Sequence, residues 1–162
     1  MVSNVTFFGM SNDGLTLDTF LPYRLSYTAS VLSERIARAY RTMFDLSIPE
    51  WRVMAHVAER PGISQQDIGD RTRMDKVMVS RAAKALAGKG LLDRAASGQD
   101  RRALRLRLSP AGRSLFDRIA PEALRLEAQV IASLSPTEIR QLRDMLGRID
   151  AATLALSTDA KP

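Results

Sequence analysis

The sequence predicts a mainly α-helical protein with one small β-hairpin. Apolar residues recur every three or four positions along most of the chain, the period of an amphipathic α-helix. Serine followed three residues later by an acidic residue opens three of these segments, a pattern that caps helix N-termini. Residues 103–108, Ala-Leu-Arg-Leu-Arg-Leu, instead alternate with the period of two that is typical of a β-strand.

The N-terminal part divides into an arm and a long helix. We expect residues 1–16 to form a flexible arm, because they lack periodicity and contain two glycines and two asparagines. Residues 17–46 are expected to form an amphipathic helix whose polar side carries several arginines. A helix of this length needs another surface on which to pack. Its apolar stripe comprises Leu21, Leu25, Ala29, Leu32, Ile36, Tyr40 and Met43.

Three short helices are predicted next. Capping boxes at Ser47–Glu50 and Ser64–Asp67 begin the first two, and Pro61-Gly62 ends the first. Asp75 caps the third, which ends near Gly88. The inward face of this third helix carries Val79, Ala82, Ala83 and Leu86. Its outward face is cationic and polar and carries Lys76, Met78, Ser80, Arg81 and Lys84.

A hairpin and two further helices complete the chain. Two strands, residues 91–94 and 103–108, flank the turn-rich segment 97–100, with Arg105 and Arg107 facing outward. Ser109-Pro110 begins a helix in which Pro121 is expected to cause a kink, and a capping box at Ser135–Glu138 begins the last helix. The sequence thus predicts a lobe over residues 47–109, C-terminal helices over 110–156 and a frayed tail over 157–162.

The charge distribution points to a polyanionic partner. The chain has a net charge of +6 and an isoelectric point of about 10.3. Between Arg71 and Arg113 there are twelve basic and three acidic residues, so the remainder of the chain is acidic on balance. A positive field confined to one region favours a nucleic-acid interface over a general surface property, although a solvated basic face is the simpler alternative.

Three short helices followed by a hairpin with a basic tip is the order of a winged helix-turn-helix. The third short helix is long enough to enter a major groove, and the start of the second offers donors to the phosphate backbone. The basic hairpin tip suits a narrow minor groove. The residues expected to contact double-stranded DNA are Ser64, Gln65, Gln66, Asp75, Lys76, Met78, Ser80, Arg81, Lys84, Asp100, Arg101, Arg102 and Arg105.

Three segments together resemble the signature of multiple-antibiotic-resistance-type (MarR) regulators. They are Leu86-Ala-Gly-Lys-Gly-Leu-Leu-Asp-Arg94, Asp100-Arg-Arg-Ala103 and Leu108-Ser-Pro-Ala-Gly-Arg113. The resemblance implies a homodimer held by N- and C-terminal dimerisation helices, with Asp100 orienting a neighbouring arginine and Arg102 reaching the minor groove. The chain departs from the family at Val77 and Met78, where relatives frequently carry small hydroxyl residues; this bears on base preference rather than on docking.

The resemblance also implies a small-molecule effector between the dimerisation helices and the DNA-binding lobe. Arg24, Tyr27, Trp51 and Arg52 are candidates for holding an aromatic carboxylate or its thioester, while core packing is the default role of the aromatic residues. Such a protein would be a repressor released from a pseudo-palindromic operator. An architectural or protein-interaction module that uses the same fold without an effector is the alternative.

Other classes of function lack support in the sequence. Ser80 and Lys84, one turn apart, could form a nucleophile pair, but this spacing is common on any helix, and we expect no enzymatic activity and no cofactor. The single histidine, His56, and the absence of cysteine exclude a cysteine–histidine metal cluster and thiol-based redox sensing. No membrane span or secretory signal is evident, so we expect a cytoplasmic protein.

Overall fold

The computed structural model describes residues 15–96 and 104–159. It contains six helices and a three-stranded antiparallel sheet within these ranges. The elements are α1 (Leu21–Phe44), α2 (Ile48–Glu59), β1 (Ile63–Ser64), α3 (Gln65–Thr72), α4 (Lys76–Gly88), β2 (Leu92–Ala96), β3 (Leu104–Leu108), α5 (Pro110–Val130) and α6 (Pro136–Asp159).

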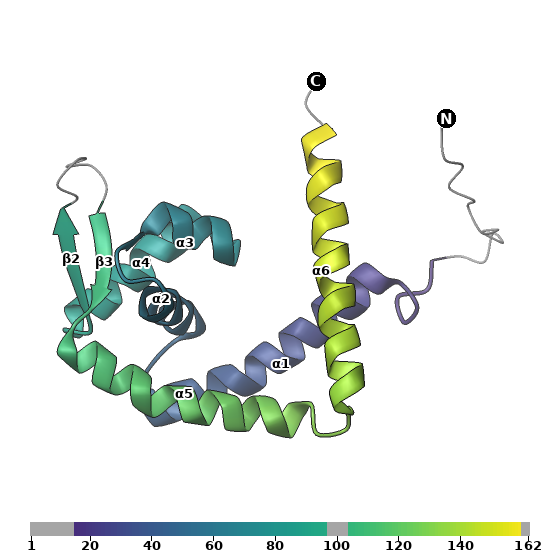
Figure 1. Cartoon of the computed structure of the whole chain (residues 1–162), viewed down its shortest axis with the longest axis horizontal. Coiled ribbons are helices and arrows are strands. Elements are labelled where there is room, and N and C mark those ends of the chain that lie inside the picture. Colours follow the sequence, from purple (N-terminus) through teal and green to yellow (C-terminus); the bar gives the residue numbers. More distant parts are fainter. Residues whose placement is uncertain (1–14, 97–103, 160–162) are drawn as a thin grey trace.

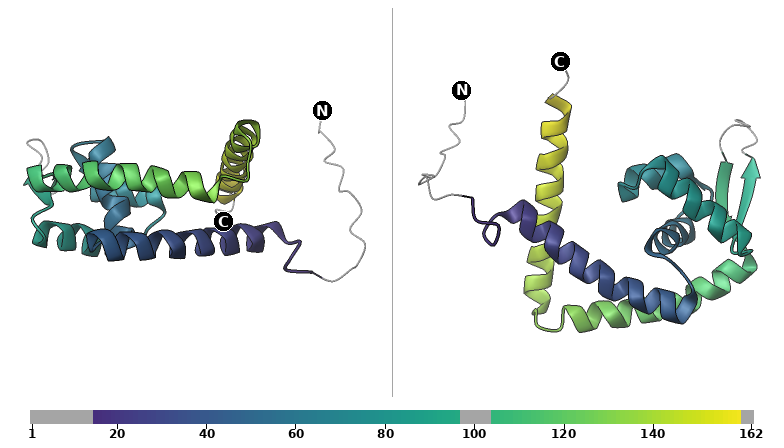
Figure 2. Two further views of the ribbon diagram at one scale, coloured as in Figure 1. Left: turned by 90° about the horizontal axis from the view of Figure 1, so that it is seen from below. Right: turned by 180° about the vertical axis from the view of Figure 1, so that it is seen from behind.

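A small lobe sits at one end of two long helices (Figure 1). The lobe contains α2, α3, α4 and the sheet, while α1 and α5 meet near the lobe and diverge as they extend away from it (Figure 2). Helix α6 turns away from the far end of α5, and its C-terminal half lines a hollow together with the end of α3. The mainly α-helical fold with a β-hairpin is therefore confirmed, and α1, α5 and α6 form an extended body beside the lobe.

The predicted helix starts are confirmed by their caps. The Ser47 amide donates to Glu50 Oε2 over 2.7 Å, and the Ser135 amide makes the same 2.7 Å bond to Glu138 Oε2. At the start of α4, Asp75 Oδ1 accepts from the Met78 amide at 2.7 Å. These bonds satisfy amides that have no partner inside a helix, so the capping motifs are enough to place the starts of α2, α4 and α6.

The core of the lobe is aliphatic. Val53, Met54 and Val57 of α2 are fully buried, and they pack with the inward face of α4 and with Leu106 of β3. Tyr40 from the end of α1 and Ile119 from α5 join the same cluster, so the two long helices are anchored to the lobe by their lobe-proximal ends. His56 is half-buried in α2, in keeping with a packing role.

The sheet contains one strand that the sequence did not predict. Its order is β1-β3-β2, and the register pairs Ile63 with Leu106 and Ser64 with Arg105. Strand β1 has two residues, which is too short for a period of two to appear in the sequence. Its pairing gives the hairpin a third strand and connects the start of α3 directly to β3.

Two expectations on boundaries change. Helix α1 begins at Leu21 rather than residue 17, because Pro22 fits only in the first turn of a helix and residues 17–19 form a turn before it. Helix α6 continues to Asp159 instead of fraying from Ser157, since no glycine or proline interrupts residues 148–159. Helix α5 runs through Pro121, as the sequence predicted. The expected arm falls mostly outside the described residues, which begin at Leu15.

Candidate nucleic-acid interface

The turn between α3 and α4 is built by local hydrogen bonds and one left-handed residue. Arg73 adopts φ 55°, and the Thr72 hydroxyl donates to the Ile68 carbonyl at 2.7 Å while accepting from the Met74 amide at 3.3 Å. Met74 is buried, with 7% of its surface exposed. A Cβ at Gly69 would lie 3.3 Å from the Met74 carbonyl oxygen, so a small residue lets the turn close against α3.

Helix α4 divides into a buried and an exposed face, as predicted. Val79, Ala83 and Leu86 are fully buried and Ala82 nearly so. The predicted outward residues are all exposed: Lys76, Met78, Ser80, Arg81 and Lys84. Because the inward face is fixed by the core, the outward face has one orientation relative to the lobe.

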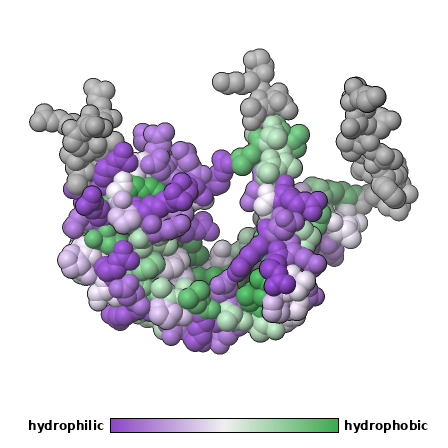
Figure 3. Space-filling model, in the orientation of Figure 1, coloured by the Kyte–Doolittle hydropathy of each residue, from purple (hydrophilic) through white to green (hydrophobic). Residues whose placement is uncertain are grey.

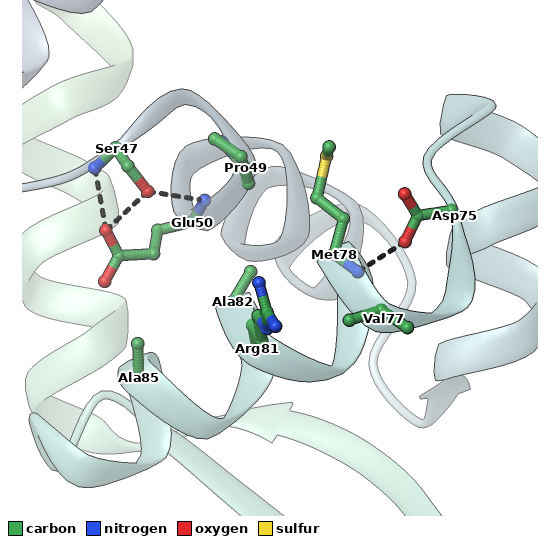
Figure 4. Close-up of a pocket in the computed structure, with 9 residues that line it drawn as sticks. All are labelled: Ser47, Pro49, Glu50, Asp75, Val77, Met78, Arg81, Ala82 and Ala85. Carbon is green, nitrogen blue, oxygen red and sulfur yellow. Dashed lines mark hydrogen bonds between the residues drawn. The ribbon is translucent and has the colours of Figure 1, made fainter.

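A groove of about 400 Å³ runs between the N-terminal end of α2 and α4 (Figure 4). Met78, Arg81 and Ala85 line its α4 side, and Ser47, Pro49 and Glu50 line its α2 side. The exposed face of α4 is therefore bordered by a hollow lined with both polar and apolar residues, not by a flat surface.

The start of α3 lies beside the start of α4. A hollow of about 520 Å³ brings Gln65, Gln66, Asp75 and Lys76 to one place, so four of the residues expected at DNA are neighbours. Ser64 is already engaged, since its hydroxyl donates to Asp67 Oδ2 at 2.7 Å and accepts from the Asp67 amide at 3.1 Å. The hydrogen bonds from Ser64 lower the pKa of the Asp67 carboxyl, with smaller contributions from Arg105 and Arg71.

The sheet presents part of the predicted wing. Arg105 and Arg107 are exposed and Leu106 between them is fully buried, as the alternation predicted. One nitrogen of Arg105 donates to the Gly62 carbonyl over 3.2 Å, a contact that local sequence reasoning missed because the two residues are far apart in the chain. The predicted wing-tip residues Asp100, Arg101 and Arg102 lie outside the described residues.

A three-residue ionic cluster joins the end of α4 to the α1–α2 corner. Lys89 Nζ lies 3.1 Å from Glu50 Oε1 and 3.3 Å from Asp45 Oδ2, and it also donates to the Asp45 carbonyl. Desolvation favours the neutral form of Glu50, but hydrogen bonds from Ser47 and Lys89 outweigh it and lower the pKa of the carboxyl. Desolvation likewise opposes the charge on Lys89, yet Glu50 and Asp45 raise its pKa overall.

This Lys89 cluster was not predicted from the sequence. Asp45 and Glu50 precede Lys89 by about forty residues, and each charge has an ordinary surface explanation when the chain is read alone. In the structure the cluster links the end of α4 to the corner between α1 and α2.

The junction between β3 and α5 is a second fixed point. Ser109 caps α5 by accepting from the Gly112 amide at 3.0 Å, and its hydroxyl donates to the Gly90 carbonyl at 2.6 Å. The Ser109 amide donates to the Leu91 carbonyl at 3.2 Å. A Cβ at Gly112 would lie 2.0 Å from that same carbonyl oxygen, so the close approach of α5 to residue 91 requires glycine.

The four candidate effector residues are not brought together within one chain. Arg24 lies over the Tyr27 ring, 5.7 Å from its centroid, on the exposed first half of α1. Trp51 packs between Tyr40 and Phe116, with ring centroids 4.9 and 5.7 Å away. Tyr27 and Tyr40 are thirteen residues apart on one helix, about 20 Å along its axis. Arg52 is exposed on α2.

Over residues 15–96 and 104–159, no group of three or more histidine, aspartate or glutamate side chains is arranged to hold a metal ion. In the same part of the chain, no helix has the length and apolar character needed to cross a membrane.

A capped helix-turn-helix that presents a cationic helix beside an arginine-bearing hairpin defines a winged helix-turn-helix DNA-binding protein. The MarR family model matches residues 44–103, which span the lobe from the end of α1 into the wing. An HTH-type transcriptional repressor of Mycobacterium tuberculosis is 25% identical over 136 residues, which cover 84% of this chain and 97% of that protein. On these matches the lobe of this chain is similar to that of MarR-family regulators, and the proteins it matches are named as transcriptional regulators.

Other proteins are similar to this chain in part of its sequence or in its fold. An uncharacterized HTH-type transcriptional regulator of Bacillus subtilis is 32% identical over 87 residues, 54% of this chain, and the match spans about half of that relative (53%). The structure of a MarR/EmrR family regulator from Acinetobacter covers 86% of this chain and 98% of its own, with a TM-score of 0.80 and 24% identity. The PcaV regulator of Streptomyces coelicolor, solved in complex with its natural ligand, covers the same shares with a TM-score of 0.72 and 24% identity.

Proposed function

We propose that this protein is a sequence-specific transcriptional repressor that binds a pseudo-palindromic operator as a homodimer in the cytoplasm. The observation that carries the proposal is the exposed face of α4, where Arg81 and Lys84 project opposite the buried face and Lys76 is exposed in the first turn. In this proposal α4 enters the major groove and the β2–β3 wing meets the adjacent minor groove. The start of α3, with Gln65 and Gln66, contacts the phosphate backbone.

Support for the homodimer comes from the apolar surface outside the lobe. Of the α6 residues 136–156, none is buried and Ile139 alone is half-buried. Leu142, Met145, Leu146 and Ile149 form a stripe at positions i, i+3, i+4 and i+7, and each is 39–49% exposed. Leu21, Val31 and Leu124 on α1 and α5 are also more than half exposed. Figure 3 shows hydrophobic residues, in green, on the exposed surface of α6.

A second copy of the chain is the occupant that this surface fits. Patches of this kind are uncommon on monomers, and a helix is stabilised mainly by burying its apolar face. We propose residues 17–46 and 110–156 as the dimerisation helices and residues 47–109 as the DNA-binding lobe. In a dimer, the α1 half that carries Arg24 and Tyr27 would be placed against a partner rather than against solvent.

Binding to DNA can be tested by electrophoretic mobility on the DNA upstream of the gene. We expect the protein to prefer this DNA to a random duplex at moderate salt. Arg81→Ala should lose about 1–3 kcal/mol of binding free energy and relax the preference at one base position, whereas Lys84→Ala, a phosphate contact, should weaken all duplexes alike and reduce the salt dependence. Equal affinity for upstream and random DNA would overturn sequence-specific repression.

Release by an effector is a separate test. We propose an aromatic carboxylate or its thioester, bound between the dimerisation helices and the lobe with Arg24, Tyr27, Trp51 and Arg52 as candidate contacts. A ligand present at about 100 times its Kd should stabilise the folded protein by about 2.7 kcal/mol and should weaken operator binding. A compound that stabilises the protein without weakening operator binding would argue against release. Operator binding that no tested compound changes would favour an effector-independent module.

A further inference from the structure

Val77 is an apolar residue on the cationic face of α4. It lies in the first turn of the helix, and 57% of its surface is exposed. Single exposed aliphatic residues are common on proteins and need no explanation by themselves. The position of Val77 relative to the other residues of α4 is what makes it informative.

The buried stripe of α4 defines which side chains project farthest outward. At about 100° per residue, Val77, Arg81 and Lys84 fall on one line directly opposite the stripe that contains Val79 and Leu86. Figure 4 shows Val77 and Arg81 on successive turns, while Met78 projects toward the α2 side, where it lines the groove with Pro49. Of these side chains, Val77 is thus in line with the outermost cations.

Asp75 gives this first turn a defined geometry. Its carboxylate caps the Met78 amide at 2.7 Å, and the backbone of the turn is held just before Val79 enters the core. Valine has a single strongly preferred χ1 rotamer in a helix, so its two methyl groups have a fixed direction. A rigid apolar knob therefore stands at the end of α4 that, in helix-turn-helix proteins, contacts base edges.

We propose that Val77 reads the C5-methyl group of a thymine in each operator half-site. The proposal rests on the proposed function, in which α4 enters the major groove. Valine offers no donor or acceptor, so placing it against a polar base edge would remove water from that edge without replacing the hydrogen bond. Thymine is the standard base that presents a methyl group in the major groove. Arg81, one turn farther along, is then positioned over a neighbouring base pair of the same half-site.

Replacing thymine by uracil tests this directly, because uracil keeps every hydrogen-bonding group and lacks only the methyl. The probe is a duplex that the wild-type protein selects from a random-sequence pool, with each thymine changed to uracil in turn. We expect one position in each half-site at which uracil weakens wild-type binding about fourfold, the loss of one methyl-sized apolar contact. In Val77→Ala the same change should alter affinity by less than twofold.

Two control variants isolate the contribution of Val77. Lys84→Ala should weaken binding to the thymine and uracil duplexes equally, so that their ratio stays at about fourfold. Met78→Ala should also retain the ratio, whatever its effect on overall affinity, because the Met78 side chain leaves α4 about 100° around the helix from that of Val77. Circular dichroism on each variant checks folding, which these exposed positions should leave unchanged.

Each outcome decides between the hypotheses. A selected duplex in which no uracil replacement weakens binding overturns the role of Val77 while leaving sequence-specific binding intact. A uracil effect that persists in Val77→Ala also overturns it, since another residue must then contact the methyl. If no sequence is selected from the pool, the proposed function itself fails and the assignment of Val77 fails with it.

Discussion

Gly112→Ala tests how closely α5 approaches the lobe. The added Cβ would lie 2.0 Å from the Leu91 carbonyl oxygen and 2.9 Å from its carbon. Because a normal carbon–oxygen contact is about 3.3 Å, the two segments must separate by about 1.3 Å. That movement strains the 3.2 Å bond from the Ser109 amide to Leu91 and the 2.6 Å bond from the Ser109 hydroxyl to Gly90.

The expected loss of stability follows from three contributions. Overpacking costs about 1–3 kcal/mol, and each weakened hydrogen bond adds about 1 kcal/mol. Alanine returns up to about 1 kcal/mol through its higher helix propensity. We therefore expect Gly112→Ala to lower the free energy of unfolding by about 2–4 kcal/mol, measured from the urea midpoint at one protein concentration.

Gly88→Ala is the matched control. Gly88 is also a helical glycine, but a Cβ there would meet nothing within 4 Å. This variant should be as stable as the wild type or more stable by up to about 1 kcal/mol. If Gly112→Ala proved no less stable than Gly88→Ala, the close approach of α5 to residue 91 would be refuted.

Three further predictions concern the Lys89 cluster and α6. Lys89→Met should lower the free energy of unfolding, measured in urea, by about 2 kcal/mol, because it leaves the Glu50 carboxylate without its cation. Lys89→Arg keeps a cation and should lower this free energy less. Equal losses in the two variants would contradict the prediction. Folding lowers the pKa of Glu50, so its carboxylate stabilises the folded protein above the unfolded pKa of about 4.3, and this stabilisation is lost as the pH falls further. Glu50→Gln should therefore flatten the decline of stability in acid. An unchanged decline would count against the cluster. Ile149→Asp should shift sedimentation from dimer to monomer, while Asp144→Lys, on the opposite side of α6, should not; a monomeric wild type would refute the interface.

The helices of the lobe could be predicted because their determinants are local. Ser47, Ser64 and Asp75 each form the cap that the sequence indicated, and the inward face of α4 is the one given by its period. The same reasoning placed the first helix four residues too early, because the turn formed by residues 17–19 leaves no periodic signal. Local patterns thus predict where helices lie better than where they end.

Contacts between distant residues could not be predicted in the same way. Lys89 meets Asp45 and Glu50 only because the end of α4 packs against the α1–α2 corner, and Arg105 meets Gly62 only because β1 pairs with β3. The candidate effector set failed to assemble within one chain for the same reason, since Tyr27 and Trp51 share a chemical character but lie on different parts of the fold. Chemical type suggests a site, whereas tertiary packing decides whether one forms.

The exposed stripe on α6 has a consequence for dosage. In the proposed homodimer a second copy covers this face and association supplies part of the stability of each chain, so the melting temperature should rise with protein concentration. Occupancy of a two-site operator then follows the square of the subunit concentration when dimers are scarce. A regulator built this way responds more steeply to its own level of expression than a stable monomer would, and a modest change in synthesis becomes a larger change in repression.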